Sequence, residues 1–342
     1  MKVITFGEIM LRLSPPHYQR FSQARSFDIV YGGSESNVAA SLANYGINAE
    51  FVTRLPANEI GDACLRFLKQ SEIGTHFIVR GGERLGVYFV EMGAIQRAGQ
   101  VIYDRSNSSF ADIKPNMLDW KNVFTDATWF HWSGITPAIS SGAAEVCLKA
   151  VMTAKEMGLT VSCDLNYRGK LWKWGKLPNE IMPELIRYTD VVIGNGEAAE
   201  KCFGIKTSYA NGVTGNNEDD DSLYICENLA KRFLNIKTIA ITLRRSISAN
   251  HNSLSGILWE RDRFYKGPRY EITHIVDRLG SGDSFVGGLI YGLSFYDDHQ
   301  LALNYAIAAS CLKHSIFGDI NLVSRSEVEK LMMGDESGRI SR

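Results

Sequence analysis

Residues 277–283, Asp-Arg-Leu-Gly-Ser-Gly-Asp, combine residue types that could hold and transfer an anionic group. The apolar run 284–295 follows at once, so this segment lies where a loop becomes a helix. Glycine lets a ligand approach the backbone closely, and the first amides of a helix lack partners within the helix. The helix dipole also favours negative charge there. The amides of residues 280–282 could therefore stabilise a phosphoryl group during transfer, and the Asp283 carboxylate could accept the proton of an attacking hydroxyl.

The same segment also has a purely structural interpretation. Aspartate is a preferred helix cap, and glycine-rich turns commonly precede helices. The segment does not match the phosphate-binding pattern G-x-x-x-x-G-K-[ST], because no lysine follows the glycines. It also lacks the third glycine and the early position of a Rossmann fingerprint. The choice between a catalytic and a capping Asp283 therefore depends on the rest of the chain.

The composition indicates an ordinary globular protein without an affinity for polyanions. The 342 residues are 45% hydrophobic and 22% charged, which suits two average domains or one large α/β domain. With 37 basic and 38 acidic residues, the net charge of −1 gives no overall attraction to nucleic acid or to an anionic membrane. The six cysteines form no C-x-x-C pair and most lie in apolar surroundings, as expected for buried residues in a reducing compartment. The seven histidines show no zinc signature.

The start of the chain shows no targeting signal. Residues 1–7 run directly into a strand-like segment, without the apolar core of a signal peptide. No apolar run approaches the ~20 residues needed to cross a bilayer. We therefore expect a cytoplasmic protein that binds neither nucleic acid nor membranes.

Strand-like and helix-like segments alternate along most of the chain. The expected strands are residues 2–6, 51–53, 127–132, 159–164, 190–193 and 238–242. The expected helices are residues 36–45, 61–70, 143–157, 223–234, 284–295 and 300–313. This alternation predicts an α/β protein of three layers, α/β/α, with a mainly parallel central sheet covered on both faces.

Two stretches, 11–30 and 86–105, carry β-type patterning with little helical character. We interpret them as a small β-sheet lid over an α/β domain formed by residues 1–10, 31–85 and 106–334, with a tail at 335–342. An extension of the main sheet is the alternative. The acidic run 216–221 predicts a solvated loop before a helix that begins at Ser222.

Four polar segments can be placed near strand ends or on the lid. Residues 32–37, Gly-Gly-Ser-Glu-Ser-Asn, precede a helix, either to contact a hydroxylated ligand or with Ser36 as a helix cap. Tyr103 and Arg105 share one face of a lid strand, where Arg105 could bind a ligand or pair with a strand neighbour. Residues 164–168 and the pair Asn195 and Glu197 each follow a buried strand.

Arginine and carboxylate chemistry suggests roles for the last two segments. Arg168 could bind a carboxylate or phosphate through two parallel hydrogen bonds. Glu197 and Asn195 could hold a hydrated magnesium ion through its waters, although Asn195 could instead cap the next helix.

In order and type, these pieces resemble the ribokinase-like (PfkB-type) carbohydrate kinases over roughly residues 2–331. The resemblance is carried by Gly32-Gly33 with Asn37, Asp164-x-Asn166-x-Arg168, Asn195-x-Glu197 and Gly280-Ser281-Gly282-Asp283. Within that family the chain is most similar to the 2-keto-3-deoxygluconate kinases, through Tyr88, residues 103–105, 164–168 and 313–319.

The resemblance implies a ribokinase-like fold and an ATP- and Mg²⁺-dependent kinase that phosphorylates the terminal (6-) hydroxyl of 2-keto-3-deoxygluconate. Asp283 would be the base, and the amides of Gly280, Ser281 and Gly282 the anion hole. The implied substrate-binding residues are Gly33, Ser34, Asn37, Tyr88, Tyr103, Arg105, Arg168 and Asp319. The implied nucleotide-binding residues are Asn166, Arg168, Asn195, Thr242, Arg244, Gly280, Gly282 and Ile307.

The chain departs from the family pattern at the cation sites. The magnesium-associated motif usually reads Asn-x-x-Glu, but here Ala198 takes the glutamate position and Glu197 precedes it. Asp277 would belong to a monovalent-cation loop in which Arg278 replaces a common threonine, which leaves K⁺ activation open. The resemblance also implies a homo-oligomer formed through the lid sheet.

A sugar acid is the expected substrate because Arg105 and Arg168 could pair with its carboxylate. A charged hydrogen bond of that kind contributes roughly 1.5–3 kcal/mol. A neutral sugar would leave a buried arginine unpaired. The alternatives are a kinase for a neutral sugar or a nucleoside, and a catalytically silent relative that binds sugar or nucleotide.

Overall fold

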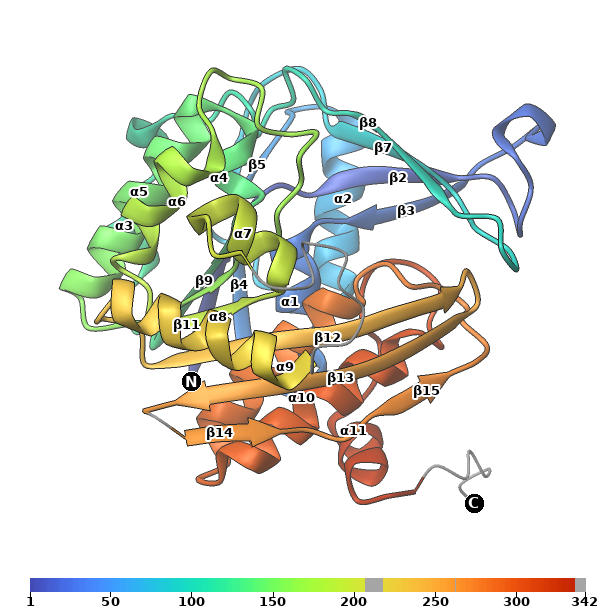
Figure 1. Ribbon diagram of the computed structural model, residues 1–342. Coiled ribbons are helices and arrows are strands. Elements are labelled where there is room, and N and C mark those ends of the chain that lie inside the picture. The colour runs from blue at the N-terminus through green and yellow to red at the C-terminus, as the bar shows by residue number, and fades with distance from the viewer. Residues whose placement is uncertain (207–217, 262, 336–342) are drawn as a thin grey trace.

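A computed structural model describes residues 1–206, 218–261 and 263–335. Its centre is a nine-stranded sheet (Figure 1). The strand order is β14 (Arg263–Lys266), β13 (His251–Glu260), β12 (Thr238–Ser248), β11 (Val191–Gly194), β10 (Thr160–Asp164), β9 (Trp129–Ser133), β1 (Lys2–Phe6) and β4 (Asn48–Val52), with β15 (Tyr270–Ile272) paired to β13.

The six strands from β12 to β4 are parallel, which confirms the predicted parallel sheet. No strand was predicted after residue 242, whereas β12 continues to Ser248 and turns back antiparallel as β13. β14 and β15 extend this edge, again antiparallel. The sheet is therefore longer and more mixed than predicted.

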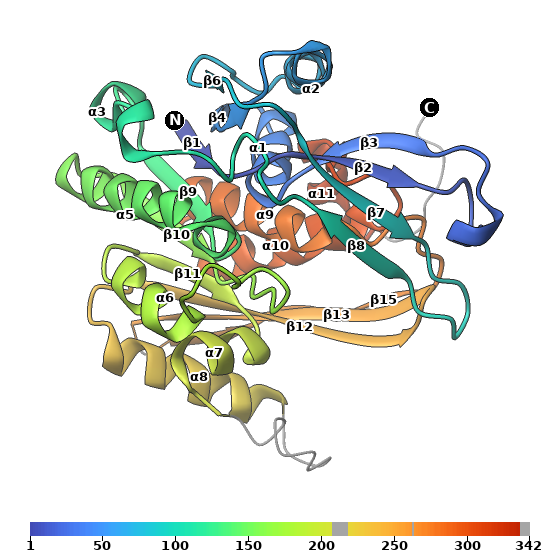
Figure 2. The same ribbon diagram turned by 90° about the horizontal axis from the view of Figure 1, so that it is seen from above.

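Helices cover both faces of the sheet (Figure 2). One face carries α3 (Trp120–Val123), α4 (Thr136–Ile139), α5 (Ser141–Glu156), α6 (Pro178–Ile186), α7 (Gly196–Phe203) and α8 (Glu218–Arg232). The other carries α1 (Ser34–Asn44), α2 (Glu59–Gln70), α9 (Ser281–Phe295), α10 (His299–Lys313) and α11 (Arg325–Met332). The predicted three-layer α/β/α arrangement is confirmed.

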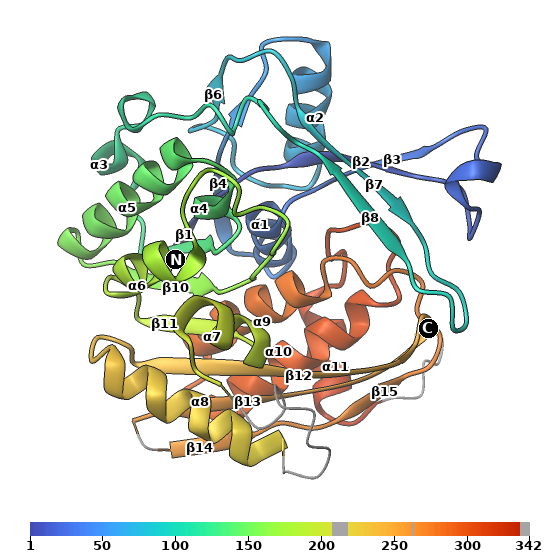
Figure 3. The ribbon, with the colours of Figure 1, turned by 45° about the horizontal axis from the view of Figure 1, so that its top comes forward.

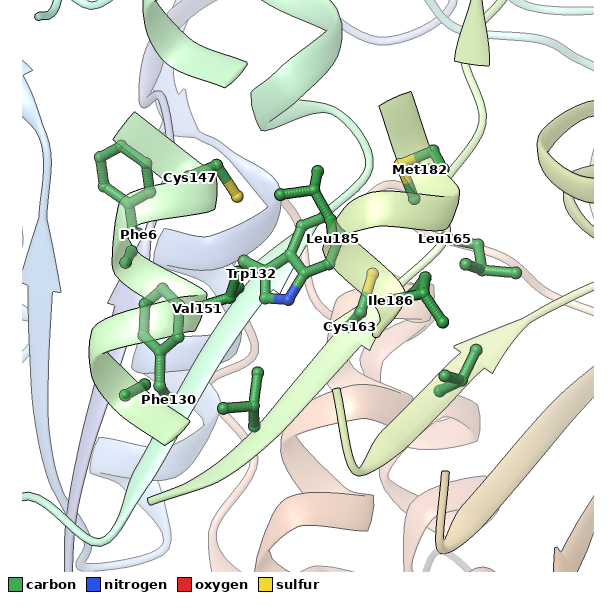
Figure 4. Packing of buried hydrophobic residues seen from close by; sticks show 14 of the residues in the cluster. Phe6, Phe130, Trp132, Cys147, Val151, Cys163, Leu165, Met182, Leu185 and Ile186 are labelled. Carbon is green, nitrogen blue, oxygen red and sulfur yellow. The ribbon is translucent and has the colours of Figure 1, made fainter. Parts of the chain in front are cut away.

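The packing of the core on the first face explains why the sequences of the central strands are continuous apolar runs. Trp132 of β9 and Cys163 of β10 pack against Cys147 of α5 and Leu185 of α6 (Figure 4). All four side chains are at most 1% exposed. Parallel strands covered on both faces bury successive side chains on alternate sides, so they lack the polar alternation of half-exposed strands.

The lid is a separate four-stranded sheet that projects from the body (Figures 1 and 3). Its order is β3 (Asp28–Gly32), β2 (Met10–Ser14), β7 (Gly86–Glu91) and β8 (Gln100–Asp104). The alternative, an extension of the main sheet, is therefore wrong. A short pair, β5 (Arg54–Leu55) and β6 (Val79–Arg80), and the 3₁₀ turns Phe21–Gln23 and Pro115–Met117 complete the elements.

The two faces of the lid sheet differ in burial. Met10 and Arg12 on β2 are buried, whereas Leu11 and Leu13, which point to the opposite face, are only half-buried. Met10, Tyr88 and Val90 on the buried face pack against Leu279, which belongs to the turn before α9. The lid therefore contacts the turn that the sequence marks as the anion site.

The acidic run differs from its prediction. Helix α8 already begins at Glu218, so residues 218–221 form its first turn, while Asn216 and Asn217 lie outside the described residues. Acidic side chains at a helix start are stabilised by the helix dipole, which explains why this stretch is helical. Lys266 and Arg269 also form ion pairs with Asp219 and Glu218 at 2.6 and 2.8 Å.

The tail predicted at 335–342 lies, apart from Asp335, outside the described residues. Within the described ranges, no helix has the length and apolar character that a membrane span requires.

Candidate active site

Helix α9 starts inside the glycine turn. Gly280 is its N-cap with φ of 77°, a left-handed conformation that favours glycine. A Cβ atom on Gly280 would lie 1.8 Å from the carbonyl oxygen of Asp319, so the turn can approach residue 319 only with glycine there. Among the described residues, none lies within 4 Å of a Cβ atom placed on Gly282, so this part of the turn faces open space.

Asp283 does not cap its own helix. Its Oδ1 accepts a hydrogen bond from Ser34 Oγ at 2.8 Å, and its Oδ2 accepts one from Asn37 Nδ2 at 2.7 Å. Both donors belong to α1, which packs against α9. The capping interpretation is therefore wrong. Burial raises the pKa of Asp283, and the hydrogen bonds from Asn37 and Ser34 oppose that rise.

The hydrogen-bond chain continues beyond Ser34. Asn166 Nδ2 donates to Ser34 Oγ at 3.0 Å, and Asn166 has a positive φ of 33°. The amide of Asn166 donates to Asp164 Oδ1 at 3.2 Å. Burial, together with the nearby charge of Asp283, raises the pKa of Asp164 to about 7. The loop after β10 thus supports the orientation of Asp283 through Ser34.

A cavity of 360 Å³ opens in front of Asp283. The carboxyl ends of β10 and β11, the middle of β12 and the start of α9 form its walls, and the carboxyl ends of strands are the usual ligand sites of open α/β sheets. The predicted residues that line it are Asn166, Arg168, Asn195, Glu197, Thr242, Arg244, Gly280, Ser281, Gly282 and Asp283. A second cavity of 470 Å³ shares Asn195, Glu197, Thr242 and Arg244 with the first.

Three arginines, Arg168, Arg244 and Arg278, line the first cavity. Partial desolvation in the cavity and the neighbouring charges of Arg278 and Arg168 lower the pKa of Arg244, although this residue is still exposed to solvent. None of the three forms an ion pair within the part of the chain that the structure describes. Three cations on one cavity wall, none of them in an ion pair with another described residue, favour an anionic ligand. Arg278 was missed as a candidate, although it directly precedes the predicted anion turn.

The two residues predicted to hold magnesium differ in their surroundings. Asn195 caps α7, since its Oδ1 accepts from the Ala198 amide at 2.9 Å, which confirms the capping alternative. Glu197 is exposed at the cavity wall. Among residues 1–206, 218–261 and 263–335, no group of three or more His, Cys, Asp or Glu side chains could hold a metal. Mg²⁺ usually takes only one or two carboxylates and binds substrate phosphates and water otherwise, so Glu197 fits such a site.

Tyr88 and Tyr103 lie on the inner lid face, and Asp319 lies beneath them. The two rings stack with centroids 6.2 Å apart, and Tyr88 Oη donates to Asp319 Oδ2 at 2.5 Å. Arg12 Nη1 lies 2.7 Å from Asp319 Oδ1 and equally 2.7 Å from Asp277 Oδ2. Asp277 thus lies in an ion pair rather than at the surface of the cavity.

Arg105 is paired with Glu8, a residue that the sequence analysis did not consider. Arg105 Nε donates to Glu8 Oε2 at 2.8 Å, and Arg105 Nη2 contacts the same oxygen. The side chains are 8% and 1% exposed. Gly33 is held against the same segment, since a Cβ on it would lie 2.0 Å from the Glu8 carbonyl oxygen.

Ile307 is placed differently from the other predicted nucleotide residues. It is fully buried on α10 within the second core and is not part of the wall of either cavity described above.

Comparison with known proteins identifies the family. The sequence model that describes the pfkB family of carbohydrate kinases matches residues 1–324 of this chain. The chain belongs to this family. A 2-dehydro-3-deoxygluconokinase from Thermotoga maritima is 46% identical, with a TM-score of 0.92 over 98% of this chain and 100% of that one.

Two further relatives carry related names. A 2-dehydro-3-deoxygalactonokinase from Haloferax volcanii is 31% identical over 98% of both chains. A putative 2-keto-3-deoxygluconate kinase from Enterococcus faecalis is 26% identical, with a TM-score of 0.89 over 100% of this chain and 99% of that one.

Glu35 is a further buried carboxyl beside the site of this carbohydrate kinase. Its Oε1 accepts hydrogen bonds from the Ser133 amide, Ser133 Oγ and Thr136 Oγ1 at 3.0, 2.7 and 2.8 Å. Its Oε2 is buried without a partner among the described residues. Burial raises the pKa of Glu35 from 4.5 to about 7, although the bonds from Ser133 and Thr136 oppose the rise.

Because the pKa of Glu35 is raised in the folded state, we expect this residue to lower the free energy of unfolding as the pH rises. Between its ordinary pKa of 4.5 and about 7, the folded state holds a proton that the unfolded state has lost. The free energy of unfolding should therefore decrease with rising pH across this window, and Glu35→Gln should show a shallower decrease. Urea denaturation of both proteins at several pH values measures the two slopes, and equal slopes would contradict the expectation.

Proposed function

We propose that this protein transfers the γ-phosphoryl group of ATP to the terminal (6-) hydroxyl of 2-keto-3-deoxygluconate. The observation that carries the proposal is the position of Asp283, whose carboxylate borders the 360 Å³ cavity together with the amides of the glycine turn. The relatives named as 2-dehydro-3-deoxygluconokinase and 2-dehydro-3-deoxygalactonokinase support the choice of a keto-deoxy sugar acid.

In the proposed reaction, Asp283 accepts the proton of the sugar hydroxyl. The hydroxyl oxygen then forms a bond to the γ-phosphorus, while the bond from this phosphorus to the β–γ bridging oxygen breaks and ADP leaves. Ser34 and Asn37 hold the carboxylate in place during the transfer. The amides of Gly280, Ser281 and Gly282 face the phosphoryl oxygens as charge develops on them, which is the main form of assistance that such a reaction needs.

The donor side of the cavity suits a polyphosphate. Arg168, Arg244 and Arg278 place three guanidinium groups along the wall, and arginine binds phosphate through paired hydrogen bonds. Mg²⁺, when bound, would neutralise part of the phosphate charge, and Glu197 is the residue that would hold it through water. The adjoining 470 Å³ cavity, with Ile225, Ile241 and Leu243 in its wall, would receive the nucleoside.

We expect no potassium requirement, because Asp277 is already neutralised by protein groups. Its Oδ2 accepts from Arg12 Nη1 at 2.7 Å and from the Gly318 amide at 3.2 Å, and its Oδ1 accepts from the Leu279 amide at 3.0 Å. Replacement of K⁺ by Na⁺ or tetramethylammonium at constant ionic strength should leave the steady-state turnover unchanged. Strong activation by K⁺ alone would show that Asp277 exchanges its partners for a cation.

We also propose that two copies associate through the outer face of the lid. One row across all four strands is apolar: Ile29 pairs with Leu13, Leu13 with Phe89, and Phe89 with Ile102. Ile29 and Ile102 are 63% and 53% exposed, and Phe21 and Phe27 pack their rings on Phe89 beside the row. A second copy of this face would cover the row, as two-fold association of one patch allows.

The oligomer is tested by placing a charge in this row. Ile29→Glu should convert a dimer to a monomer in size-exclusion chromatography with light scattering. The matched control is Leu234→Glu, since Leu234 is 89% exposed, lies between α8 and β12 outside the lid sheet, and should tolerate the charge. A monomeric wild-type protein, or an unchanged mass in the Ile29 variant, would rule out this interface.

The function is tested by coupled detection of ADP formation across a substrate panel. The panel contains both C4 epimers of the keto-deoxy acid, the corresponding aldonates, fructose, ribose and adenosine. We expect the highest kcat/KM for a keto-deoxy acid. Preference for a neutral sugar or a nucleoside, or ATP consumption that does not depend on any added acceptor, would overturn the proposal.

A further inference from the structure

Arg12 is a fully buried cation that joins the lid to the turn before α9. It lies on β2, in the centre of the lid sheet, and its side chain is 0% exposed. Its Nη1 lies 2.7 Å from both Asp277 Oδ2 and Asp319 Oδ1. The sequence separations of these pairs are 265 and 307 residues. The reaction proposed above gives Arg12 no part.

The rest of the guanidinium is also held in place. Arg12 Nε donates to Ser14 Oγ at 2.8 Å, and Nη2 contacts Met92 Sδ at 3.5 Å. The ring of Phe317 lies 5.7 Å from the guanidinium carbon. Burial disfavours the charge of Arg12, but Asp319 and Asp277 more than offset this and raise its pKa. Because Nε and Nη2 are held, the guanidinium fork is fixed, and the two N–H bonds of Nη1 point in fixed directions at the two carboxylates, which a lysine ammonium on a flexible stem does poorly.

The two carboxylates determine the shape of the anion turn. Asp277 accepts from the Leu279 amide at 3.0 Å and from the Gly318 amide at 3.2 Å, so it links the turn to the segment that carries Asp319. The carbonyl oxygen of Asp319 lies against Gly280, where a Cβ atom would approach it to 1.8 Å. A shift of either carboxylate would therefore move the backbone of residues 279–282.

The lid approaches the same turn through two further contacts. Tyr88 of β7 donates to Asp319 Oδ2 at 2.5 Å. Leu279 packs against the inner lid residues Met10, Tyr88 and Val90. The lid, the turn and the Asp319 segment are thus one connected polar and apolar unit with Arg12 at its centre.

We infer that Arg12 is a positioning residue for phosphoryl transfer, which sets the amides of residues 279–282 from the lid by holding Asp277 and Asp319. The inference rests on the proposed function, because it assigns those amides to the transferring phosphoryl group. Arg12 does not touch the reactants in this role. It acts through the two carboxylates and the turn.

The test substitutes Arg12→Lys, which keeps the charge and loses the fork. We expect kcat to fall by about 100-fold, since a small misplacement of stabilising groups has that effect. The KM values for the sugar acid and ATP should change little, because the altered groups act in the transition state. Hydrogen exchange at the amides of residues 279–284 should be faster than in the wild type, which reports the turn directly and without turnover.

The matched control is Arg97→Lys, another lid arginine in an ion pair, with Glu91 at 3.0 Å. It should leave both kcat and exchange at the turn unchanged. If Arg12→Lys does not fold, Tyr88→Phe removes the 2.5 Å hydrogen bond to Asp319 without burying a charge, and should show the same two effects in weaker form.

Two results would overturn the inference. One is an unchanged kcat in a folded Arg12 variant, and the other is a reduced kcat with unchanged exchange at residues 279–284. An inactive wild type in the substrate panel would instead contradict the proposed function, while the exchange experiment would still decide whether Arg12 holds the turn.

Discussion

Asp283→Asn should lower kcat by roughly two to four orders of magnitude, because the amide cannot accept the proton of the attacking hydroxyl. Binding of ATP should survive, since Asn has the size of Asp and the arginines of the cavity are unchanged. Steady-state kinetics with the best substrate of the panel and calorimetric titration with ATP measure the two quantities. A turnover close to that of the wild type would remove Asp283 from the role of base.

The neighbours of Asp283 provide graded controls for this result. Ser34→Ala and Asn37→Ala each remove one of its two hydrogen bonds, at 2.8 and 2.7 Å, and leave the carboxylate in place. They should lower kcat less than Asp283→Asn does. Because both bonds stabilise the ionised carboxylate, each variant should also move the acidic limb of the kcat profile to higher pH. The limb of the wild type should already lie above the ordinary Asp pKa, since burial raises the pKa of Asp283.

Arg105→Ala should lower the free energy of unfolding by about 3–5 kcal/mol, the range for a buried ion pair that loses one partner. The reason is Glu8, whose side chain is 1% exposed and would keep a charge without its cation. Urea denaturation measures the loss. The double variant Glu8→Gln with Arg105→Ala should recover part of it, because the remaining group is then neutral.

Arg84→Ala is the matched control for Arg105→Ala. Arg84 also pairs with an acidic lid residue, Asp104 at 2.9 Å, but the two side chains are 38% and 56% exposed. Exposed pairs typically contribute about 0–1 kcal/mol, so this variant should be close to the wild type. An equal decrease in the free energy of unfolding in the two variants would show that the buried Glu8–Arg105 pair stabilises the fold no more than the exposed Arg84–Asp104 pair.

The same Arg105 variant tests the prediction that Arg105 binds the carboxylate of the substrate. Under conditions where the variant is folded, binding of the acid by Arg105 predicts a larger rise in KM for the keto-deoxy acid than for ATP. Equal changes in the two KM values would mean that Arg105 acts through Glu8 and the lid alone.

The features that were predicted correctly from the sequence are those whose signal lies in a short, continuous segment of the chain. The glycine turn and Asp283 are adjacent in the chain, and the parallel strands are short apolar runs separated by helices. The lid showed period-two patterning over residues 86–105, which β7 and β8 confirm. Local patterns of this kind are available without any knowledge of the tertiary structure.

The features that were missed depend on pairs far apart in the chain. Ser34 and Asn37 reach Asp283 across 249 and 246 residues, so their role as its hydrogen-bond donors has no local signal. Glu8 and Arg12 are separated by three apolar residues, 9–11, and nothing nearby in the sequence marks the two as buried and paired. The extension of β12 was missed because this strand becomes exposed beyond Leu243 and no longer has the pattern of a buried parallel strand.

The bonds between α1 and α9 also bear on how the enzyme is made. Ser34 and Asn37 lie near the start of the chain, and the proposed base Asp283, which they hold in place, lies near its end. A nascent chain on the ribosome therefore cannot form the active site until almost all of it has been synthesised. Ser34 and Asn37 are synthesised early and can form their hydrogen bonds to Asp283 only after residue 283 has been added. Contacts of such long sequence range slow folding, and a chain released before residue 283 would be devoid of catalysis.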